Sequence, residues 1–235
     1  MKTILLNALF FGISVSLFSQ VETFDSLLNT HVTDKGVVDY KGILKDKSGL
    51  TSYVQYLVKT TPEPSWSGDK IKAFWINAYN AYTIQLIVEN YPLTSILKIN
   101  SKGKDAWNQK FAVVGGETYT LNEIEHEILR KQFSDPRIHV GVNCASYSCP
   151  PLLNRAFTEK NVDVELEQLM KSFINDPTRN LITEKKLTLS KIFEWYQEDF
   201  TKNGKLISYI DAYSEVTLTK KTKIRYMEYN WNLNE

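Results

Sequence analysis

The sequence lacks the motifs that mark several common chemistries. It contains no phosphate-binding loop, no dinucleotide fingerprint, no G-x-S-x-G elbow and no H-E-x-x-H metal motif. Only three histidines are present, His31, His126 and His139, and none stands at a familiar zinc-ligand spacing from a cysteine or a carboxylate. We therefore predict no metal site and no cofactor.

An excess of charge of one sign is also missing. The chain has 28 Lys and Arg against 27 Asp and Glu, which gives a net charge of +1, and the two signs are interspersed. This pattern provides neither a basic track for nucleic acid nor a cationic membrane face. A hydrophobic content of 43%, with no internal repeat and no low-complexity tract, is typical of a globular protein rather than a disordered one.

The N-terminus has the pattern of a secretory signal peptide. Met1 and Lys2 are followed by apolar or small residues over 3–18, and then by the small residue Ser19. The apolar stretch is shorter than the roughly 20 residues that a transmembrane helix needs. We expect residues 1–19 to be removed and residues 20–235 to work in the periplasm or outside the cell, with no transmembrane segment. An uncleaved anchor is the alternative.

After cleavage, about 215 residues remain, which is the size of one domain. Residues 69–91 are apolar on nearly every side, which predicts a buried central helix that ends before Pro92. Helices outnumber strands and the strands favour hairpin pairing, so we predict a single α+β domain, helix-rich with a small, mostly antiparallel sheet. The further helices are expected at 22–29, 44–59, 121–133, 162–174, 191–200 and 206–213, and the strands at 36–40, 111–114, 117–119, 137–142, 186–189 and 223–229.

Two amides stand on the central helix. Asn77 and Asn80 project to the same side of it, among small residues. A buried amide without partners costs about 1–3 kcal/mol, so both need hydrogen bonds. Either they pin neighbouring loops through backbone groups, or one of them lines a binding site.

A carboxylate interrupts the apolar face of the predicted helix 121–133. Glu125 falls in the middle of the apolar arc, and His126 falls at its edge. A buried carboxylate must find a cation or strong donors. Either Glu125 forms a structural pair with Arg137, with His139 or with backbone N–H groups of the loop 143–149, or Glu125 and His126 point into a site.

The predicted strand 137–142 leads into an irregular loop. If this strand is regular, Arg137, His139, Gly141 and Asn143 face the same side. The glycine would then leave room beside the imidazole of His139 for a ligand. Arg137 and Asn143 are therefore candidate binding residues, and His139 is a candidate catalytic residue.

Two cysteines, Cys144 and Cys149, stand close together in this loop. In an oxidising compartment such a pair can form a disulfide that shapes the loop. Cys144 is instead a candidate nucleophile if a base lies within reach. The third alternative is two buried thiols.

These stretches together resemble the domain of unknown function 547 (DUF547) family, over nearly all of residues 20–235. The resemblance implies an exported bacterial member, and it implies no particular activity because the family has none assigned. It is carried by FWINAYNA from Phe74, YP from Tyr91, LNEIEH from Leu121, DPRIH from Asp135, CASYSCP from Cys144, and SKIFEWY from Ser190 with Asp199 and Phe200.

Two classes of function remain open. The first is a ligand- or partner-binding domain of the cell envelope, whose aromatic residues line a groove for a small molecule, a peptide or a glycan. The alternative is a thiol-dependent hydrolase or transferase, loosely similar to the papain and transglutaminase-like group, with Cys144 as nucleophile and His139 or His126 as base. In that group the cysteine precedes the histidine, whereas Cys144 follows His139, so the site would be rearranged. We favour the binding domain.

Overall fold

A computed structural model describes the fold of residues 12–219 and 222–235, with side chains from residue 20 onward. The predicted signal peptide, residues 1–19, lies outside the residues whose side chains are described. Within the described range, none of the helices combines the length and the apolar character that crossing a membrane requires.

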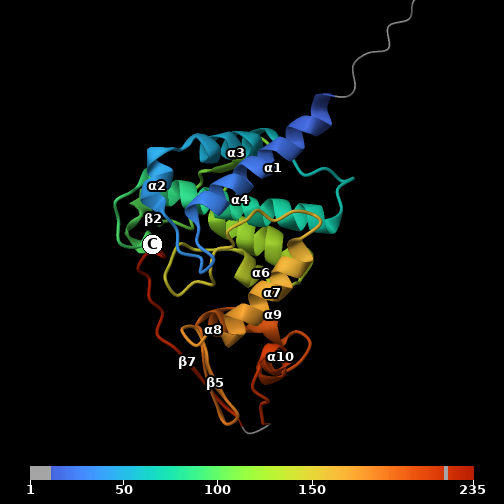
Figure 1. The fold of residues 1–235 in the computed structure, drawn as a ribbon, viewed down its shortest axis with the longest axis vertical. Coiled ribbons are helices and arrows are strands. Elements are labelled where there is room, and N and C mark those ends of the chain that lie inside the picture. The colour runs from blue at the N-terminus through green and yellow to red at the C-terminus, as the bar shows by residue number, and fades with distance from the viewer. Residues whose placement is uncertain (1–11, 220–221) are drawn as a thin grey trace, which may run out of the picture.

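The N-terminal part of the fold is a layer of helices over one central helix (Figure 1). Helix α4 passes beneath α1 and α3, and its side chains from Lys72 to Ile84 are all buried. The predicted buried central helix is thus confirmed, with Ser67 capping its first turn. The four helices of this part are α1 (Gly12–His31), α2 (Tyr40–Lys45), α3 (Ser48–Lys59) and α4 (Gly68–Glu89).

The helix predicted over 44–59 was wrong as a single element. Its first residues end α2, and α3 begins at Ser48. Asp46 separates the two, because its backbone is extended and its carboxylate accepts a hydrogen bond from the N–H of Ser48 at 3.0 Å.

Small elements connect this layer to the rest of the chain. The predicted hairpin is confirmed, since β3 and β4 pair in antiparallel register from Ala112 opposite Tyr119. Thr120 and Glu123 form a capping box, with reciprocal hydrogen bonds of 2.8 and 3.0 Å. The elements are η1 (Ile96–Lys98), β1 (Asn100–Ser101), β2 (Lys104–Asp105), β3 (Ala112–Val114), β4 (Glu117–Tyr119), the π-helical η2 (Glu123–Leu129) and α5 (Arg130–Phe133).

The strand predicted over 137–142 is wrong, because this segment is the short helix α6 (Ile138–Gly141). Asp135 starts the turn by accepting the N–H of Arg137 at 3.0 Å, and Pro136 has a backbone suited to a helix start. The common face expected for Arg137, His139, Gly141 and Asn143 therefore does not exist. A Cβ atom on Gly141 would lie 2.8 Å from Leu166, so this glycine serves close helix packing and leaves no room for a ligand.

The C-terminal part combines helices with the largest sheet. Strand β6 pairs antiparallel with β5 and parallel with β7. The expected α+β fold with small, mostly antiparallel sheets is confirmed. The predicted helix 191–200 is interrupted at Tyr196, whose backbone is not helical. The elements are α7 (Val162–Asn175), β5 (Leu181–Thr183), β6 (Lys186–Leu189), α8 (Ile192–Trp195), α9 (Gln197–Thr201), α10 (Leu206–Tyr213) and β7 (Lys223–Tyr226).

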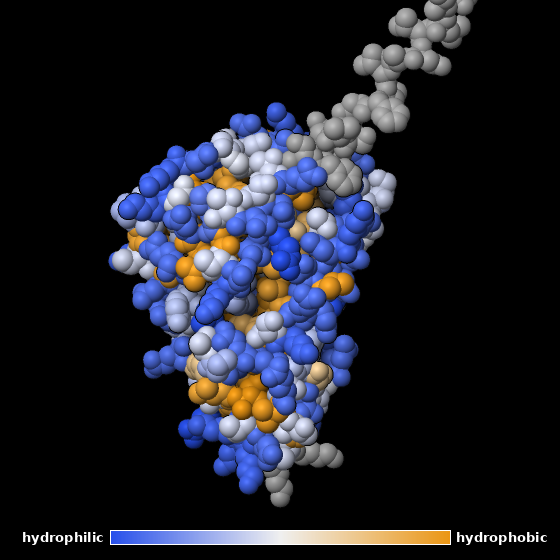
Figure 2. Space-filling model, in the orientation of Figure 1, coloured by the Kyte–Doolittle hydropathy of each residue, from blue (hydrophilic) through white to orange (hydrophobic). Residues whose placement is uncertain are grey.

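Two hydrophobic cores meet at α6. Ile138 belongs to the larger core around α4, and Val140 belongs to the smaller core beneath β6 and α10. After β7 the chain returns to the upper part of the molecule, where Asn234 accepts the N–H of Val38 at 2.8 Å (Figure 1). Polar side chains cover most of the face in Figure 2, with an apolar patch in its lower half.

Candidate functional site

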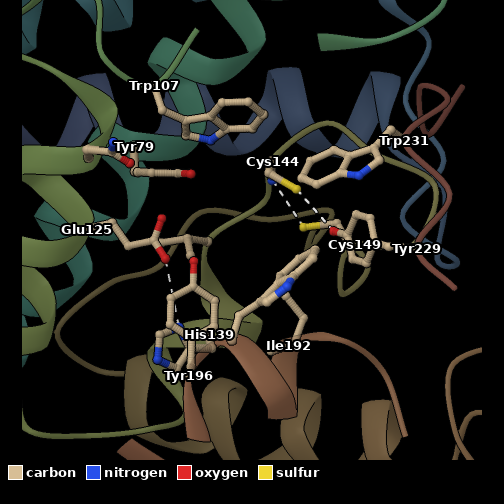
Figure 3. A pocket seen from close by; sticks show the side chains of 13 residues that line it. Tyr79, Trp107, Glu125, His139, Cys144, Cys149, Ile192, Tyr196, Tyr229 and Trp231 are labelled. Atoms are coloured by element: carbon tan, nitrogen blue, oxygen red, sulfur yellow. Dashed lines mark hydrogen bonds and ion pairs between the residues drawn. The ribbon is translucent and has the colours of Figure 1, made fainter. Parts of the chain in front are cut away.

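A pocket of about 170 Å³ lies where these parts of the chain meet. Glu125 from η2 and His139 from α6 line one end of it, and Cys144 and Cys149 line the other (Figure 3). Aromatic side chains stand between the two ends. The pocket thus brings together four of the residues that the sequence singles out, from segments that do not adjoin in the chain.

Glu125 and His139 form a buried acid–imidazole pair. Their side chains are 5% and 1% exposed, so the predicted burial of Glu125 is confirmed. Glu125 Oε1 lies 3.8 Å from His139 Nδ1, which is beyond normal hydrogen-bond reach. His139 Nδ1 has no hydrogen-bond partner, although such buried groups are nearly always paired. This atom is therefore available to a polar group that enters the pocket.

The other nitrogen of His139 is fixed by Asp199 from α9. Nε2 donates to Asp199 Oδ2 at 2.7 Å, and Arg130 Nε donates to the same oxygen at 2.6 Å. Burial by itself would raise the pKa of Asp199, but these two hydrogen bonds outweigh it and hold the pKa well below its usual value. The carboxylate stays charged and orients the imidazole.

Tyr196 supports the acid–imidazole pair from the break between α8 and α9. Its ring stacks on His139 with the centroids 3.9 Å apart. Burial raises the pKa of Tyr196 far above its ordinary value, and the charge of Glu125 and a hydrogen bond with Glu125 raise it further. The neutral hydroxyl thus donates a hydrogen bond to the carboxylate of Glu125, which supplies one of the donors that a buried carboxylate needs.

His126 does not join the pocket. Its Nδ1 lies 3.1 Å from Arg130 Nη1, and because an arginine only donates, Nδ1 must accept. His126 therefore helps to position Arg130 behind the site. The expectation that Glu125 and His126 point into one site holds for Glu125 alone.

At the opposite end, both cysteines are free thiols, so the expected disulfide is not formed in this structure. Cys144 N–H donates to Cys149 Sγ at 3.1 Å. Cys144 Sγ lies 3.2 Å from Ser146 Oγ and 3.3 Å from Tyr229 Oη, and Ser146 donates to Tyr229 at 2.8 Å. The sulfur of Cys144 thus lies beside two hydroxyl groups, of which Tyr229 has its proton free to donate to it.

These contacts make the two thiols unequal. A hydrogen bond with the Cys149 side chain, distinct from the backbone N–H bond, lowers the pKa of Cys144 to about 7 against the opposing effect of burial, and Ser146 and Tyr229 lower it further. Burial raises the pKa of Cys149 well above its usual value, and the neighbouring Cys144 adds to this rise. Cys144 is half-buried, whereas Cys149 is 4% exposed. A thiolate near neutral pH is therefore expected on Cys144.

The C-terminal segment completes the pocket wall. Tyr229 and Trp231 pack with ring centroids 4.5 Å apart, and Trp231 stacks on Trp195 at 5.8 Å. The backbone of this segment binds the cysteine loop, since Tyr147 N–H donates to Asn232 at 2.6 Å. Trp107 lies against Trp231 from the opposite side, at 5.7 Å. Aromatic rings from three separate segments thus line the space between Glu125 and Cys144.

Three of the predicted binding residues are structural. Asn77 accepts from and donates to the backbone of Phe157, at 2.9 and 2.7 Å. Asn80 donates to Gly141 O at 2.9 Å and accepts the N–H of Asn143 at 2.9 Å. The Asn143 side chain donates to Pro150 O at 2.8 Å. These amides pin loops by their backbones, as the first of the two interpretations proposed.

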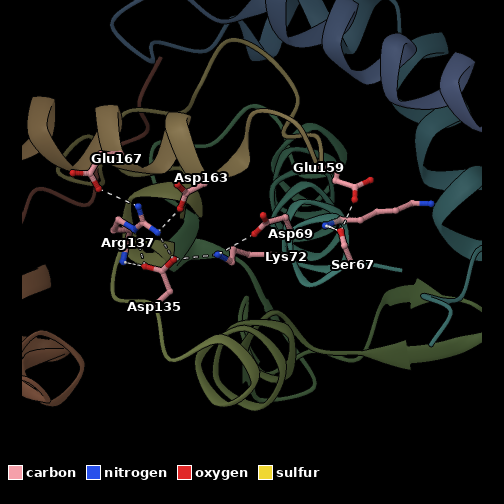
Figure 4. A network of polar contacts seen from close by, with 9 residues as sticks. Ser67, Asp69, Lys72, Asp135, Arg137, Glu159, Asp163 and Glu167 are labelled. Atoms are coloured by element: carbon pink, nitrogen blue, oxygen red, sulfur yellow. Dashed lines mark hydrogen bonds and ion pairs between the residues drawn. The ribbon is translucent and has the colours of Figure 1, made fainter. Parts of the chain in front are cut away.

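Arg137 also lies away from the pocket. It forms ion pairs with Asp135, Asp163 and Glu167 at 2.7–3.0 Å, and Lys72 joins the same network through Asp135 (Figure 4). Arg137 therefore ties α6 to α7, and it does not contact Glu125 as one alternative expected. In the described part of the chain, no group of three or more histidines, cysteines and carboxylates is arranged to hold a metal.

Sequence reasoning missed the residues that support the site. Tyr196 and Asp199 occur in a stretch that carries the family resemblance, which was the available signal for them. Trp195 lies in the same stretch, whereas Tyr229 and Trp231 gave no local signal, because an aromatic residue that lines a pocket has the same sequence pattern as one in a core.

Comparison with known proteins gives one family. No curated protein and no solved structure matches the chain. Residues 64–174 match the family described as "Protein of unknown function, DUF547". The matched stretch includes α4, Glu125, His139 and both cysteines, whereas Tyr196, Asp199 and the C-terminal segment lie beyond it. The chain therefore carries a DUF547 domain over these residues.

Proposed function

We propose that this chain is an exported ligand-binding domain, and that its pocket receives one ring or one side chain of a small molecule, a peptide or a glycan. The observation that carries the proposal is the orphaned His139 Nδ1 beside the buried carboxylate of Glu125, both at the end of an aromatic-walled pocket. A buried polar atom without a partner is costly, and a ligand donor or acceptor would relieve that cost.

The shape of the pocket suits a small group. Its volume of about 170 Å³ is below the roughly 300–1,000 Å³ of pockets that enclose whole drug-sized ligands. The aromatic walls favour a flat or apolar face, and the acid–imidazole pair favours a hydrogen-bonding group at its tip. Trp195 is 46% exposed at the pocket wall, so the rest of a larger ligand has an aromatic surface on which to extend.

The alternative, a thiol-dependent hydrolase or transferase, needs a base next to the nucleophile. Among the described residues no hydrogen bond joins Cys144 to His139 or His126, because Cys144 contacts Ser146 and Tyr229 while His139 contacts Asp199. The low pKa of Cys144 favours thiol chemistry without that base, and hydrolysis is less well supported than binding.

Tryptophan fluorescence tests the binding proposal, because Trp107, Trp195 and Trp231 line the pocket. The probes are free amino acids, their N-acetyl amides and simple monosaccharides at millimolar concentration. We expect one class to change the emission saturably, and the Trp195→Ala variant to weaken its binding about tenfold, which corresponds to about 1.4 kcal/mol. Calorimetry measures the same affinities independently.

Trp66→Phe is the matched control, because Trp66 packs on Phe74 and does not line this pocket. It should leave the affinity unchanged. A panel without saturable binding, or binding that Trp195→Ala leaves intact, would contradict the proposal.

Export needs a separate test. The first described side chain of α1 is Gln20, which accepts a hydrogen bond from Ser52 at 2.9 Å, and the first fully buried one is Phe24. A chain that starts at Gln20 should therefore fold as stably as the full chain. Mass spectrometry of periplasmic or secreted material should give an N-terminus near Gln20, and recovery of only the cytoplasmic full-length chain would exclude export.

A further inference from the structure

We infer that Cys144 and Cys149 are a dithiol pair that exchanges with a disulfide bound in the pocket, with Cys144 as the attacking thiol and Cys149 as the resolving thiol. The inference rests on the proposed function in one respect, namely that the pocket admits a ligand as far as Cys144. It goes beyond binding because it assigns a redox reaction and a substrate class, a small or peptide-borne disulfide.

The positions of the two thiols agree with Cys144 as the attacking thiol and Cys149 as the resolving thiol. Both thiols line the pocket, but Cys144 is half-buried, whereas Cys149 is only 4% exposed. The backbone N–H of Cys144 donates to Cys149 Sγ at 3.1 Å, which holds the second sulfur against the first residue. The more exposed Cys144 is therefore the thiol that a ligand in the pocket should meet first, with Cys149 next to it.

The surroundings of Cys144 favour a thiolate. Ser146 donates to Tyr229 at 2.8 Å, so the single proton of the Tyr229 hydroxyl is free to point at Cys144 Sγ, 3.3 Å away. Tyr229 belongs to the C-terminal segment, which is bound to the cysteine loop by the hydrogen bonds from Tyr147 and Ser148 to Asn232 and Asn230. The segment that closes the pocket thus also supplies a donor to the attacking sulfur.

The difference in acidity agrees with the same roles. The pKa of Cys144 is lowered to about 7, first by the hydrogen bond with Cys149, and that of Cys149 is raised, first by burial. Thiol–disulfide exchange proceeds through the thiolate, and an attacking thiol works best when its pKa lies near the ambient pH. Once Cys144 is bound in a mixed disulfide its charge is gone, and one cause of the raised pKa of Cys149 disappears with it.

The reaction balances without a further cofactor. The Cys144 thiol first releases its proton to solvent, and the thiolate then attacks one sulfur of the ligand disulfide to form a mixed disulfide, while the other ligand sulfur leaves with the electron pair and takes a proton. Cys149 then loses its proton, attacks Cys144 Sγ and displaces the second ligand thiol. The ligand gains two electrons and two protons, the Cys144–Cys149 pair loses two electrons and two protons, and the new disulfide needs an external dithiol to restore it.

Glutathione disulfide tests the inference directly, with intact-protein mass spectrometry as the measurement. The wild type should lose two hydrogens and carry no lasting adduct. Cys149→Ser should stop at one glutathione adduct on Cys144, and Cys144→Ser should stay unmodified. The adduct should form on Cys144 at least about tenfold faster than on Cys149, with a rate that rises through a midpoint near pH 7.

An adduct on Cys149 in the Cys144→Ser variant at a similar rate, or a wild-type adduct that never resolves, would overturn the inference. If a thermal melt shows that either serine variant does not fold, peptide mapping of the wild type at limiting glutathione disulfide is used instead. It shows which of the two cysteines carries the glutathione adduct first. Binding of non-disulfide probes is measured by fluorescence on Cys144→Ser. If the non-disulfide probes bind but the wild type does not react with glutathione disulfide, only the exchange reaction is refuted. If the probes bind neither the wild type nor any variant, the proposed function is refuted.

Discussion

The amides of α4 and the acid–imidazole pair of the pocket are equally buried, but they differ in whether their polar atoms have hydrogen-bond partners. Asn77 and Asn80 are 2% and 3% exposed, and each side chain both donates to and accepts from a backbone. As whole residues, Glu125 and His139 are 4% and 2% exposed, yet His139 Nδ1 has no hydrogen-bond partner and Glu125 Oε1 is 3.8 Å away from it.

The difference separates structural from functional burial. A satisfied amide stabilises the fold and offers nothing to a ligand, whereas an orphaned ring nitrogen at a pocket costs stability and is available for binding. Substitutions of the first kind should therefore lower stability without changing binding, and substitutions of the second kind should do the reverse.

Asn80→Leu should have the largest effect on stability. The change leaves the carbonyl of Gly141 and the N–H of Asn143 buried without partners, so we expect a loss of about 2–5 kcal/mol in the free energy of unfolding. Urea denaturation measures it. Probe binding of the folded fraction should be unchanged at low temperature, and a loss below about 1 kcal/mol would show that the amide is not a structural tie.

Asp199→Asn should have an intermediate, pH-dependent effect. Asp199 and Arg130 are 15% and 24% exposed, so we discount the buried-pair value and expect a loss of about 1–3 kcal/mol at pH 7. Since the folded pKa of Asp199 is lowered, its contribution is present above the unfolded value near 3.9 and is lost as the pH falls through the folded pKa. In urea denaturation the stabilities of the wild type and the variant should therefore begin to converge below about pH 4 and approach each other further as the pH falls toward the folded pKa.

Asp163→Asn is the matched control for this pair, because Asp163 is 64% exposed and also binds an arginine, Arg137. It should change stability by at most about 0.5 kcal/mol. A pH-independent loss for Asp199→Asn would mean that its charge does not stabilise the site.

Glu125→Gln should have the smallest effect on stability. His139 is already paired with Asp199, so removing the charge of Glu125 leaves no orphaned cation, and the loss of about 3–5 kcal/mol typical of a broken buried pair should not occur. We expect a change within about 1 kcal/mol in thermal and urea unfolding, together with at least tenfold weaker probe binding.

Glu127→Gln makes the same substitution two residues along, where the side chain is 57% exposed and paired with Lys131. It should alter neither stability nor binding. If Glu125→Gln instead lowers the free energy of unfolding by several kcal/mol while the folded fraction still binds the probe, the carboxylate is structural. The contrast with Asn80 is then lost.

Local signals predicted much of the fold and part of the site. The central helix followed from apolar residues on every side of 69–91, and the hairpin from two short strand patterns, 111–114 and 117–119, separated by two residues. Glu125 followed from its place in an apolar arc, even though η2 is π-helical. The strand expected over 137–142 failed because a helix of four residues is too short to show a period, so that Asp135 and Pro136 were the only local signs of a helix start.

The sequence by itself determined that Glu125, His139 and the two cysteines are candidate site residues, because the burial pattern and the side-chain chemistry that mark them are local. Only the tertiary structure decided which of them meet. His139 finds Asp199 sixty residues further along the chain, and Cys144 finds Tyr229 eighty-five residues further along, through the break at Tyr196 and the returning C-terminal segment. Contacts between such distant residues depend on the packing of whole elements, and no local period encodes them.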